Sequence, residues 1–410
     1  MGWNSWDCFA TTITESQTKA EADYMAAHLK DHGWRYVIVD IQWYEPAASG
    51  YDYRPGAALV LDEWGRLLPA VNRFPSAAAA KGFGPLADYI HSLGLKFGIH
   101  LLRGIPRQAY ERNLPIKGTS YRARDIADVN SVCRWNTDMF GVDMTMPGAQ
   151  AYFDSVFALI ASWGVDYVKV DDISRPYHVG EIEGVRNAID HSGRPMVLSL
   201  SPGDTPLVSA EHVRLHANLW RISDDFWDNW TSLDQQFPRL EKWNGYRMPG
   251  AWPDADMLPL GVIALGKHAT NFTPDEQRVV MTLWSIARSP LMFGGDMLKM
   301  DPHTLTLLTN DEVLAVDQHS AHNQPLYDHD GLVAWTADAP GTVDKYVAVF
   351  NRTGSASAVG VALADLGLGT HVQVRDLWTH KMGPASGPEF SVVVPSHGAG
   401  LYRLSPATPP

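Results

Sequence analysis

Hydrophobic positions follow two periods in alternation for about three quarters of the chain. Short apolar runs typical of buried strands, such as Tyr36–Asp40 and Lys96–His100, are separated by longer segments with the spacing of amphipathic helices. The sequence also indicates where one helix begins and ends. Thr14 and Gln17 have the spacing of a capping box at its start, and Gly33 is expected to end it. This alternation predicts βα units around a parallel sheet.

Eight strands are predicted in this part of the chain. They lie near residues 1–6, 36–40, 96–101, 166–171, 196–200, 219–222, 247–251 and 290–294. Helix starts near Pro85, Pro147 and Thr273 fall between them. Eight such units predict an α/β protein with a (β/α)8 TIM barrel over residues 1–317.

The pattern changes after about Gln318. Helical periodicity fades, and short alternating runs appear between turn residues. The runs are 332–335, 346–350, 372–375 and 390–394. This pattern predicts a C-terminal antiparallel β-sandwich domain over residues 318–410.

Composition narrows the classes of partner. Apolar residues make up 45% of the 410 residues, which permits a large core, while charged residues make up 19% and the net charge is −13. A chain this acidic lacks the basic surface that nucleic acid or an anionic membrane requires. It has no apolar run of about 18 residues, so no membrane-spanning helix is expected. The 15 Trp residues suit both a core and platforms for sugar rings.

The two cysteines, Cys8 and Cys133, permit one disulfide, although two separate thiols are the favoured interpretation. We recognise no signal peptide. The chain is therefore expected to act in the cytoplasm, or to be secreted or periplasmic with a leader outside this sequence. Oligomerisation remains open.

Carboxylates follow two of the predicted strands. In the segment Val165–Asp172 the predicted strand ends in Asp171, and Lys169 lies two residues earlier on the same strand face. The strand at 219–222 is followed by Asp225. Because chemistry is placed at the carboxyl ends of parallel strands, this pattern predicts a hydrolase that uses a pair of carboxylates.

The surroundings of the two residues suggest different roles. A cation at Lys169 would keep Asp171 ionised, as a nucleophile requires. Phe226 and Trp227 would desolvate Asp225 and raise its pKa toward that of a general acid. For either Asp alone, a helix N-cap or a surface loop residue is an equal alternative.

Further polar residues follow other predicted strands: Asp40, His100, Arg221, Asp254 and Asp256. Arg221 is suited to hold two sugar hydroxyls, and Asp40 and Asp256 to accept from others. A structural salt bridge for Arg221 and a neutral core role for His100 remain alternatives. The sequence shows no HExxH, CxxC, calcium-loop, nucleotide-binding or Gly-x-Ser-x-Gly motif, so we expect no metal and no cofactor.

These residues stand in segments that resemble glycoside hydrolase family 27, the α-galactosidase family. The resemblance covers essentially the whole chain. Its segments are Met1–Trp6, Tyr167–Asp171, Trp220–Arg221 with Asp225, Trp252–Met257 and Ser289–Leu291. The resemblance implies a retaining exo-glycosidase that acts by double displacement, with Asp171 as nucleophile, Asp225 as acid/base and no cofactor. It also implies a subsite for the terminal sugar formed by Trp6, Asp40, Lys169, Arg221 and Asp256.

Three departures from the family pattern bear on the substrate. Members that act on galactose carry two adjacent Asp residues where this chain has Asp40 and Ile41. Ile41 cannot accept a hydrogen bond from a 6-hydroxyl, so it favours β-L-arabinopyranose, which lacks that group, and this feature resembles the family's β-L-arabinopyranosidases. His100 replaces a Tyr, and Ser201 is a candidate contact for the 2-hydroxyl.

The sequence therefore predicts removal of terminal β-L-arabinopyranosyl residues, and less well of α-D-galactosyl residues, from plant-type glycosides. The alternatives are an α-galactosidase proper, an isomalto-dextranase-like α-glucan hydrolase and a non-catalytic carbohydrate-binding scaffold. The loops 45–75 and 103–132 would shape the aglycone side. In the retaining mechanism the carboxyl groups of Asp171 and Asp225 should lie about 5–6 Å apart.

Overall fold

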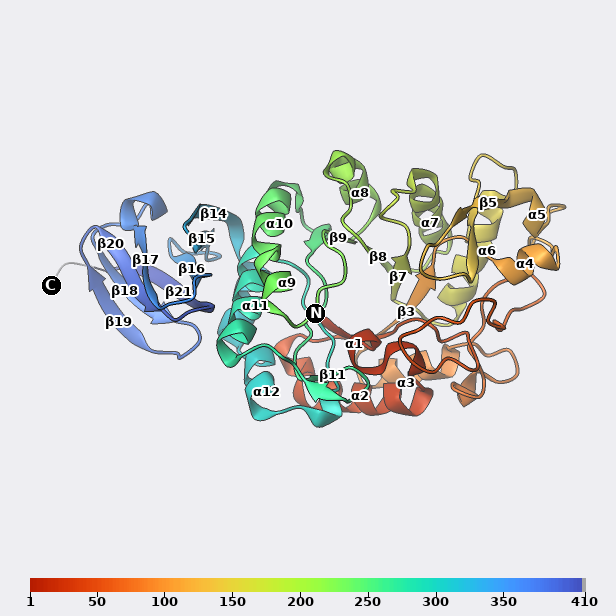
Figure 1. Ribbon diagram of the computed structural model, residues 1–410, viewed down its shortest axis with the longest axis horizontal. Helices are drawn as coiled ribbons and strands as arrows, with labels where there is room; N and C mark the ends of the chain where they lie inside the picture. Colours follow the sequence, from red (N-terminus) through yellow and green to blue (C-terminus); the bar gives the residue numbers. More distant parts are fainter. Residues whose placement is uncertain (408–410) are drawn as a thin grey trace. The chain divides into compact units, whose positions relative to one another are not determined.

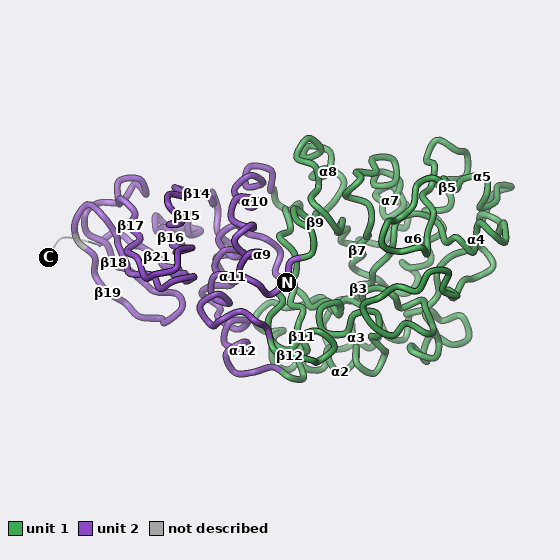
Figure 2. The backbone as a smooth tube through the Cα atoms, viewed as in Figure 1, with its two compact units in different colours: residues 1–225, 248–269, 292–299 green, residues 226–247, 270–291, 300–410 purple. Residues whose placement is uncertain are grey.

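The computed structural model describes residues 1–407, which form two compact units (Figure 2). The first unit comprises residues 1–225, 248–269 and 292–299. The second comprises residues 226–247, 270–291 and those from 300 onward. All eight strands of the parallel sheet lie in the first unit.

The parallel sheet has the strand order β10-β9-β8-β7-β3-β2-β1-β13. The two ends of the sheet meet, because Leu258, just after β10, forms a parallel bridge to Phe293 of β13. The N–H of Leu258 donates to the carbonyl oxygen of Met292 at 2.7 Å. The predicted (β/α)8 fold is confirmed. The strands are β1 (Gly2–Asn4), β2 (Tyr36–Val39), β3 (Lys96–Leu102), β7 (Tyr167–Asp171), β8 (Val197–Leu200), β9 (Leu219–Arg221), β10 (Trp252–Asp254) and β13 (Met292–Phe293).

Helices connect successive strands of the sheet (Figure 1). Two of the predicted helix starts are confirmed as capping boxes, Thr14 with Gln17 and Thr273 with Glu276. Gly33 ends the first connection with a φ of 92°, which a residue with a Cβ rarely adopts. The main helices are α2 (Glu15–His28), α3 (Gly84–Ser92), α6 (Ala149–Ser162), α7 (Val179–His191), α8 (Ala210–His216), α9 (Trp230–Asp234), α10 (Gln236–Trp243) and α11 (Pro274–Ala287).

An apolar layer inside the sheet determines which way the polar strand ends face. Ile38, Tyr167, Leu219 and Met292, from four different strands, belong to one buried cluster. Gly98 makes room for it, since a Cβ there would lie 2.8 Å from Ile38 Cγ1. Because side chains alternate along a strand, the positions two and four residues after Tyr167 face the same interior.

Long connections at the carboxyl ends of β2 and β3 carry further elements. After β3 the chain forms a three-stranded sheet in the order β4-β6-β5. The elements of this insertion are β4 (Ile105–Pro106), α4 (Arg107–Glu111), α5 (Ala123–Ile126), β5 (Ala127–Val132) and β6 (Met139–Val142). Shorter elements of the first unit are α1 (Trp6–Phe9) and the hairpin of β11 (Val262–Ile263) and β12 (His268–Ala269).

The seventh strand was predicted too early in the chain. Residues 247–251 form a turn instead, in which Met248 and Ala251 pair through their backbones and Gly250 has a φ of 83°. The strand β10 follows at Trp252–Asp254 and pairs with β9. The apolar residues around Gly250 resemble a strand, but the left-handed glycine turns the chain before the ladder begins.

The second unit contains the predicted antiparallel strands, and the C-terminal β-sandwich is confirmed. One sheet has the order β14-β15-β16-β21-β18-β19, and a second consists of β17 and β20. Val347, Val359, Phe390 and Leu404 belong to its buried core. Its strands are β14 (Ala321–His329), β15 (Leu332–Asp338), β16 (Lys345–Asn351), β17 (Ser357–Ala362), β18 (His371–Asp376), β19 (Met382–Ser386), β20 (Glu389–Val394) and β21 (Gly398–Pro406).

Two helices precede the sandwich strands, α12 (Pro302–Leu308) and α13 (Asp311–His319). The proposed domain boundary after residue 317 lies in the last turn of α13. Cys8 and Cys133 are both buried free thiols, as the favoured interpretation of the sequence predicted. Within residues 1–407, no helix combines the length and the apolarity needed to cross a lipid bilayer.

Candidate active site

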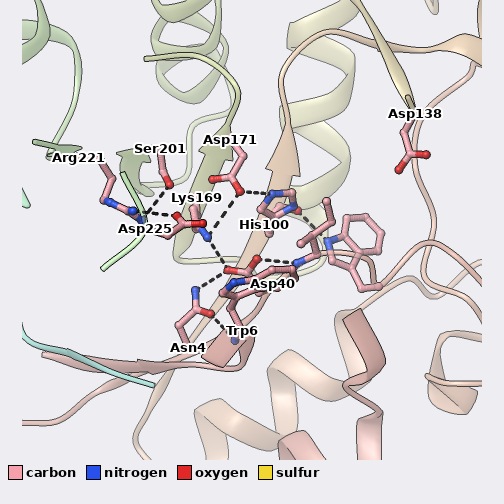
Figure 3. Close-up of polar contacts among 12 residues, drawn as sticks. Asn4, Trp6, Asp40, His100, Asp138, Lys169, Asp171, Ser201, Arg221 and Asp225 are labelled. Atoms are coloured by element: carbon pink, nitrogen blue, oxygen red, sulfur yellow. Dashed lines mark hydrogen bonds and ion pairs between the residues drawn. The ribbon is translucent and has the colours of Figure 1, made fainter. Parts of the chain in front are cut away.

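Most of the predicted site residues lie at or just after the carboxyl ends of the parallel strands, and their side chains gather in one place (Figure 3). Trp6 follows β1, Asp40 and Ile41 follow β2, and His100 lies within β3. The remaining predicted residues are Lys169 and Asp171 on β7, Ser201 after β8, Arg221 at the end of β9, Asp225 after it, and Asp256 after β10.

Two carboxylates are predicted from the sequence as nucleophile and acid/base, and Asp171 is the more enclosed of the two. It is buried, and its Oδ2 lies 3.0 Å from His100 Nε2 and 3.6 Å from Lys169 Nζ. Both contacts use the same oxygen. Oδ1, the other oxygen, is buried and makes neither of these contacts.

The charge state of Asp171 follows from these neighbours. Burial by itself would raise the pKa of this carboxyl, but the charges of Lys169 and His100 outweigh it and hold the pKa well below its usual range. Burial by itself would lower the pKa of Lys169, but the carboxylates of Asp171 and Asp40 outweigh burial and raise this pKa well above its usual range. The pair is therefore ionised, as the sequence predicted.

Removing the charge of Lys169 should change the pH dependence of catalysis. In a Lys169→Met variant burial still raises the pKa of Asp171, while its strongest opposing charge is gone. The nucleophile role predicted from the sequence requires an ionised Asp171, so on that prediction the acid limb of kcat/KM should move to higher pH. A Lys169→Arg variant keeps the charge and should retain the wild-type limb. If the acid limb of kcat/KM lies at the same pH in the Lys169→Met variant and the wild type, this role of Lys169 is contradicted.

Asp40 is held rigidly at the end of β2. Its Oδ2 accepts from Lys169 Nζ at 2.9 Å and from Asn4 Nδ2 at 2.7 Å. Its backbone N–H donates to Ser5 Oγ at 2.9 Å. Asn4 and Ser5 were not singled out by the sequence analysis, although their place at the end of the first predicted strand was a usable signal. Asp40 therefore has little freedom to reorient.

The segment after Asp40 is equally fixed. Ile41 is buried, and its N–H donates to Asp40 Oδ1 at 2.8 Å. Gln42 Nε2 donates to Asp138 Oδ2 at 2.5 Å, and Trp43 Nε1 donates to His100 O at 2.7 Å. Hydrogen bonds therefore hold the residues on both sides of Ile41.

Arg221 joins the other half of the site. Its guanidinium contacts Asp256 Oδ1 at 2.6 Å and Asp225 Oδ1 at 3.0 Å, and donates to Ser201 Oγ at 3.5 Å. Ser201 itself follows β8, and its N–H donates to Val170 O of β7 at 2.9 Å. Since β7 and β9 both flank β8, contacts run continuously from the Asp171 strand to Asp225. The separation of about 5–6 Å between the two carboxyl groups stays a prediction.

The prediction that aromatic rings desolvate Asp225 is wrong. Its side chain is 52% exposed, so neighbouring rings do not desolvate it. Phe226 is the first residue of the second unit, in which its ring lies 5.0 Å from that of Trp284. In a short loop after a strand, adjacent side chains point in different directions, and the sequence does not reveal which of them covers the carboxyl. The contact that orients Asp225 comes from Arg221.

Aromatic side chains form one wall of the site. Trp6 stacks on Tyr53 with the rings 7° from parallel and meets Tyr51 edge-on at 5.5 Å. Burial, and then the charges of Asp171 and Asp40, raise the pKa of Tyr53 well above its usual range, so it stays a neutral phenol beside them. The sequence analysis missed Tyr53, because it lies in an irregular loop without periodicity.

A second missed residue is Asp7. Its carboxyl is buried, and burial together with the charges of Asp256 and Asp225 raises its pKa well above the usual range. Burial and the neighbouring carboxylates thus favour the neutral form of Asp7 over a further negative charge. The signal in the sequence was its position one residue after Trp6.

Asp40, His100 and Asp171 offer ligand atoms within 4.8 Å of one another, a grouping that could in principle hold a metal ion. Lys169 Nζ lies 2.9 Å from Asp40 and 3.6 Å from Asp171, so an ammonium group already takes the place of a cation among these carboxylates. The absence of a required metal remains a prediction from the sequence.

Comparisons with known proteins agree in family. A profile described as "Alpha galactosidase A" matches residues 137–319, and one for the "Alpha galactosidase C-terminal beta sandwich domain" matches residues 329–404. The α-galactosidases of Cyamopsis tetragonoloba and Coffea arabica are each 30% identical, over 99% of this chain and 86% and 93% of their own lengths. A crystal structure of a family-27 β-L-arabinopyranosidase from Geobacillus stearothermophilus, in complex with arabinose, is 52% identical, covers 100% of this chain and 97% of its own, and has a TM-score of 0.97.

Proposed function

The chain belongs to glycoside hydrolase family 27, the α-galactosidase family, and from that premise we propose that it removes terminal β-L-arabinopyranosyl residues by double displacement and acts less well on α-D-galactosyl residues. The observation that carries the sugar preference is Ile41, an apolar residue fixed directly after Asp40. The similarity to the Geobacillus stearothermophilus β-L-arabinopyranosidase supports it.

In the first step Asp171 Oδ1 attacks the anomeric carbon of the terminal sugar. The bond to the aglycone oxygen breaks as Asp225 gives that oxygen a proton, and the sugar becomes an ester of Asp171. The half-exposed position of Asp225 suits this role, because the leaving group arrives from the solvent side. Lys169 and His100 keep the attacking carboxylate ionised until the bond forms.

In the second step a water molecule takes the place of the aglycone. Asp225, now ionised, removes a proton from that water, whose oxygen attacks the anomeric carbon and releases Asp171. Two inversions leave the anomeric configuration of the product equal to that of the substrate. Arg221, whose guanidinium lies 3.0 Å from Asp225 Oδ1, holds this carboxyl in position for both steps.

Ile41 sets the proposed preference between sugars. β-L-Arabinopyranose has the ring stereochemistry of galactose without the C6 hydroxymethyl group. A galactoside would place its 6-hydroxyl beside a side chain that offers no hydrogen bond, which costs about 1–3 kcal/mol. Asp40, held by Lys169 and Asn4, still accepts from a ring hydroxyl in both sugars.

The test compares kcat/KM for p-nitrophenyl β-L-arabinopyranoside and p-nitrophenyl α-D-galactopyranoside. The energy above predicts that the arabinoside is favoured by roughly 5- to 150-fold. An Ile41→Asp variant should shift the ratio toward the galactoside, because its carboxylate can accept from the 6-hydroxyl. An Ile41→Val variant, which stays apolar, should keep the wild-type preference.

Galactoside turnover equal to or above arabinoside turnover would assign the chain as an α-galactosidase proper. An unchanged ratio in Ile41→Asp would remove the argument from this residue. Activity on neither substrate, with release of isomalto-oligosaccharides from dextran, would favour the α-glucan alternative.

A further inference from the structure

Three side chains with metal-binding atoms lie together away from the active site. Glu183 lies on α7, and His212 and His216 lie four residues apart on the neighbouring helix α8. One atom from each, a carboxylate oxygen or a ring nitrogen, lies within 4.8 Å of the other two. Residues at positions i and i+4 share a helix face, so both imidazoles are presented to α7 together.

Hydrogen bonds already orient the two rings. His216 Nδ1 lies 2.7 Å from the carbonyl oxygen of His212. A carbonyl only accepts, so this nitrogen carries a proton, and in the neutral imidazole Nε2 is then the nitrogen with the lone pair. His212 Nδ1 lies 2.7 Å from Tyr177 Oη, and the two imidazoles stack at 4.1 Å with 19° between their planes. Outer hydrogen bonds of this kind fix metal-binding histidines in proteins.

One of the three spacings between ligand atoms, at present a hydrogen bond between His212 and Glu183, matches that around a small cation. His212 Nε2 lies 3.2 Å from Glu183 Oε1. In a tetrahedral site with bonds of about 2.0–2.1 Å, neighbouring ligand atoms lie about 3.3 Å apart. Two imidazoles and one carboxylate are ligands typical of zinc, whereas calcium and magnesium prefer oxygen atoms alone.

We propose that Glu183, His212 and His216 form a binding site for a divalent transition-metal ion, with zinc as the best fit and water as the remaining ligand. Glu183 is 48% exposed, so an ion reaches the site from solvent. The ion would join α7 to α8, the helices on either side of β8 in the sequence. Its expected effect is on stability, because it lies on the helices and not at the strand ends that carry Asp171 and Asp225.

The proposal is tested by titrating the metal-stripped full-length protein with ZnCl2 in a calorimeter. One Zn²⁺ should bind per chain, and saturating Zn²⁺ should raise the Tm by a few degrees, roughly 2–5 °C. MgCl2 at the same concentration should do neither. The variants His212→Gln and His216→Gln should weaken Zn²⁺ binding by roughly 100-fold or more and remove the Tm shift.

Two further variants keep the test decisive. Glu183→Gln changes a half-exposed side chain and should weaken binding as well. His191→Gln on α7 is the matched control, because His191 also lies 3.0 Å from a carboxylate, that of Asp154, and should leave binding unchanged. The proposal is overturned if the wild type shows no saturable Zn²⁺ binding, or if Glu183→Gln and both histidine variants bind as it does.

Discussion

An Asp171→Gly variant is expected to lose hydrolysis of aryl β-L-arabinopyranosides by a factor on the order of 10⁴ or more. The reason is that no other described carboxylate contacts both His100 and Lys169 at the end of β7. Without Asp171 no covalent intermediate forms, and water must attack directly. The measurement is kcat on a substrate with an activated leaving group, together with thermal unfolding of the variant to show that it is folded.

Azide provides the control for this variant. A small anion can occupy the space left by the Asp171 carboxylate, next to the positive charge of Lys169. Turnover should recover with added sodium azide, and the product should be an arabinopyranosyl azide of inverted configuration, because only one displacement occurs. Recovery without inversion, or wild-type hydrolysis without azide, would show that Asp171 is not the nucleophile.

Replacing the acid/base gives the second large effect. An Asp225→Asn variant should lose about 10²–10⁴-fold in kcat/KM on substrates with poor leaving groups, which need a proton to depart. Substrates with activated leaving groups should lose much less in the same measurement. This split separates proton donation from a structural role, since a misfolded site would lose both equally.

The adjacent residue offers a matched control. Asp224 is 62% exposed and pairs with Arg175 at 2.5 Å, away from Arg221. Asp224→Asn should therefore keep the activity of the wild type on both kinds of substrate. A uniform loss in Asp225→Asn on poor and activated leaving groups would argue against acid/base catalysis by this residue.

Periodicity was sufficient for most of the fold. Strands that end in a functional residue, such as Tyr167–Asp171, combine an apolar run with alternation and are recognisable locally. The strand at Trp252–Asp254 was misplaced, because Gly250 takes a left-handed conformation that ordinary apolar neighbours do not announce. The boundary of the sandwich remains a proposal at residue 317.

The candidate site was predictable where residues follow strands and not where they come from loops. Asp40, Lys169 and Arg221 could be placed because parallel strands end at one edge of a sheet. Tyr53 lies in an irregular loop, and its stacking on Trp6 depends on the path of the whole connection after β2. The exposure of Asp225 likewise depends on side-chain directions in a loop.

The central claim is that Asp171 forms an ester with the sugar while Asp225 serves the leaving group and the water. It is tested most directly by incubating the wild-type protein with a fluorinated β-L-arabinopyranosyl substrate that bears an activated leaving group, followed by proteolysis and mass spectrometry. We predict one added fluorinated arabinopyranosyl group per chain, attached to Asp171. A label on Asp225 or any other residue, or release of a first product with inverted configuration and no label, would contradict the account.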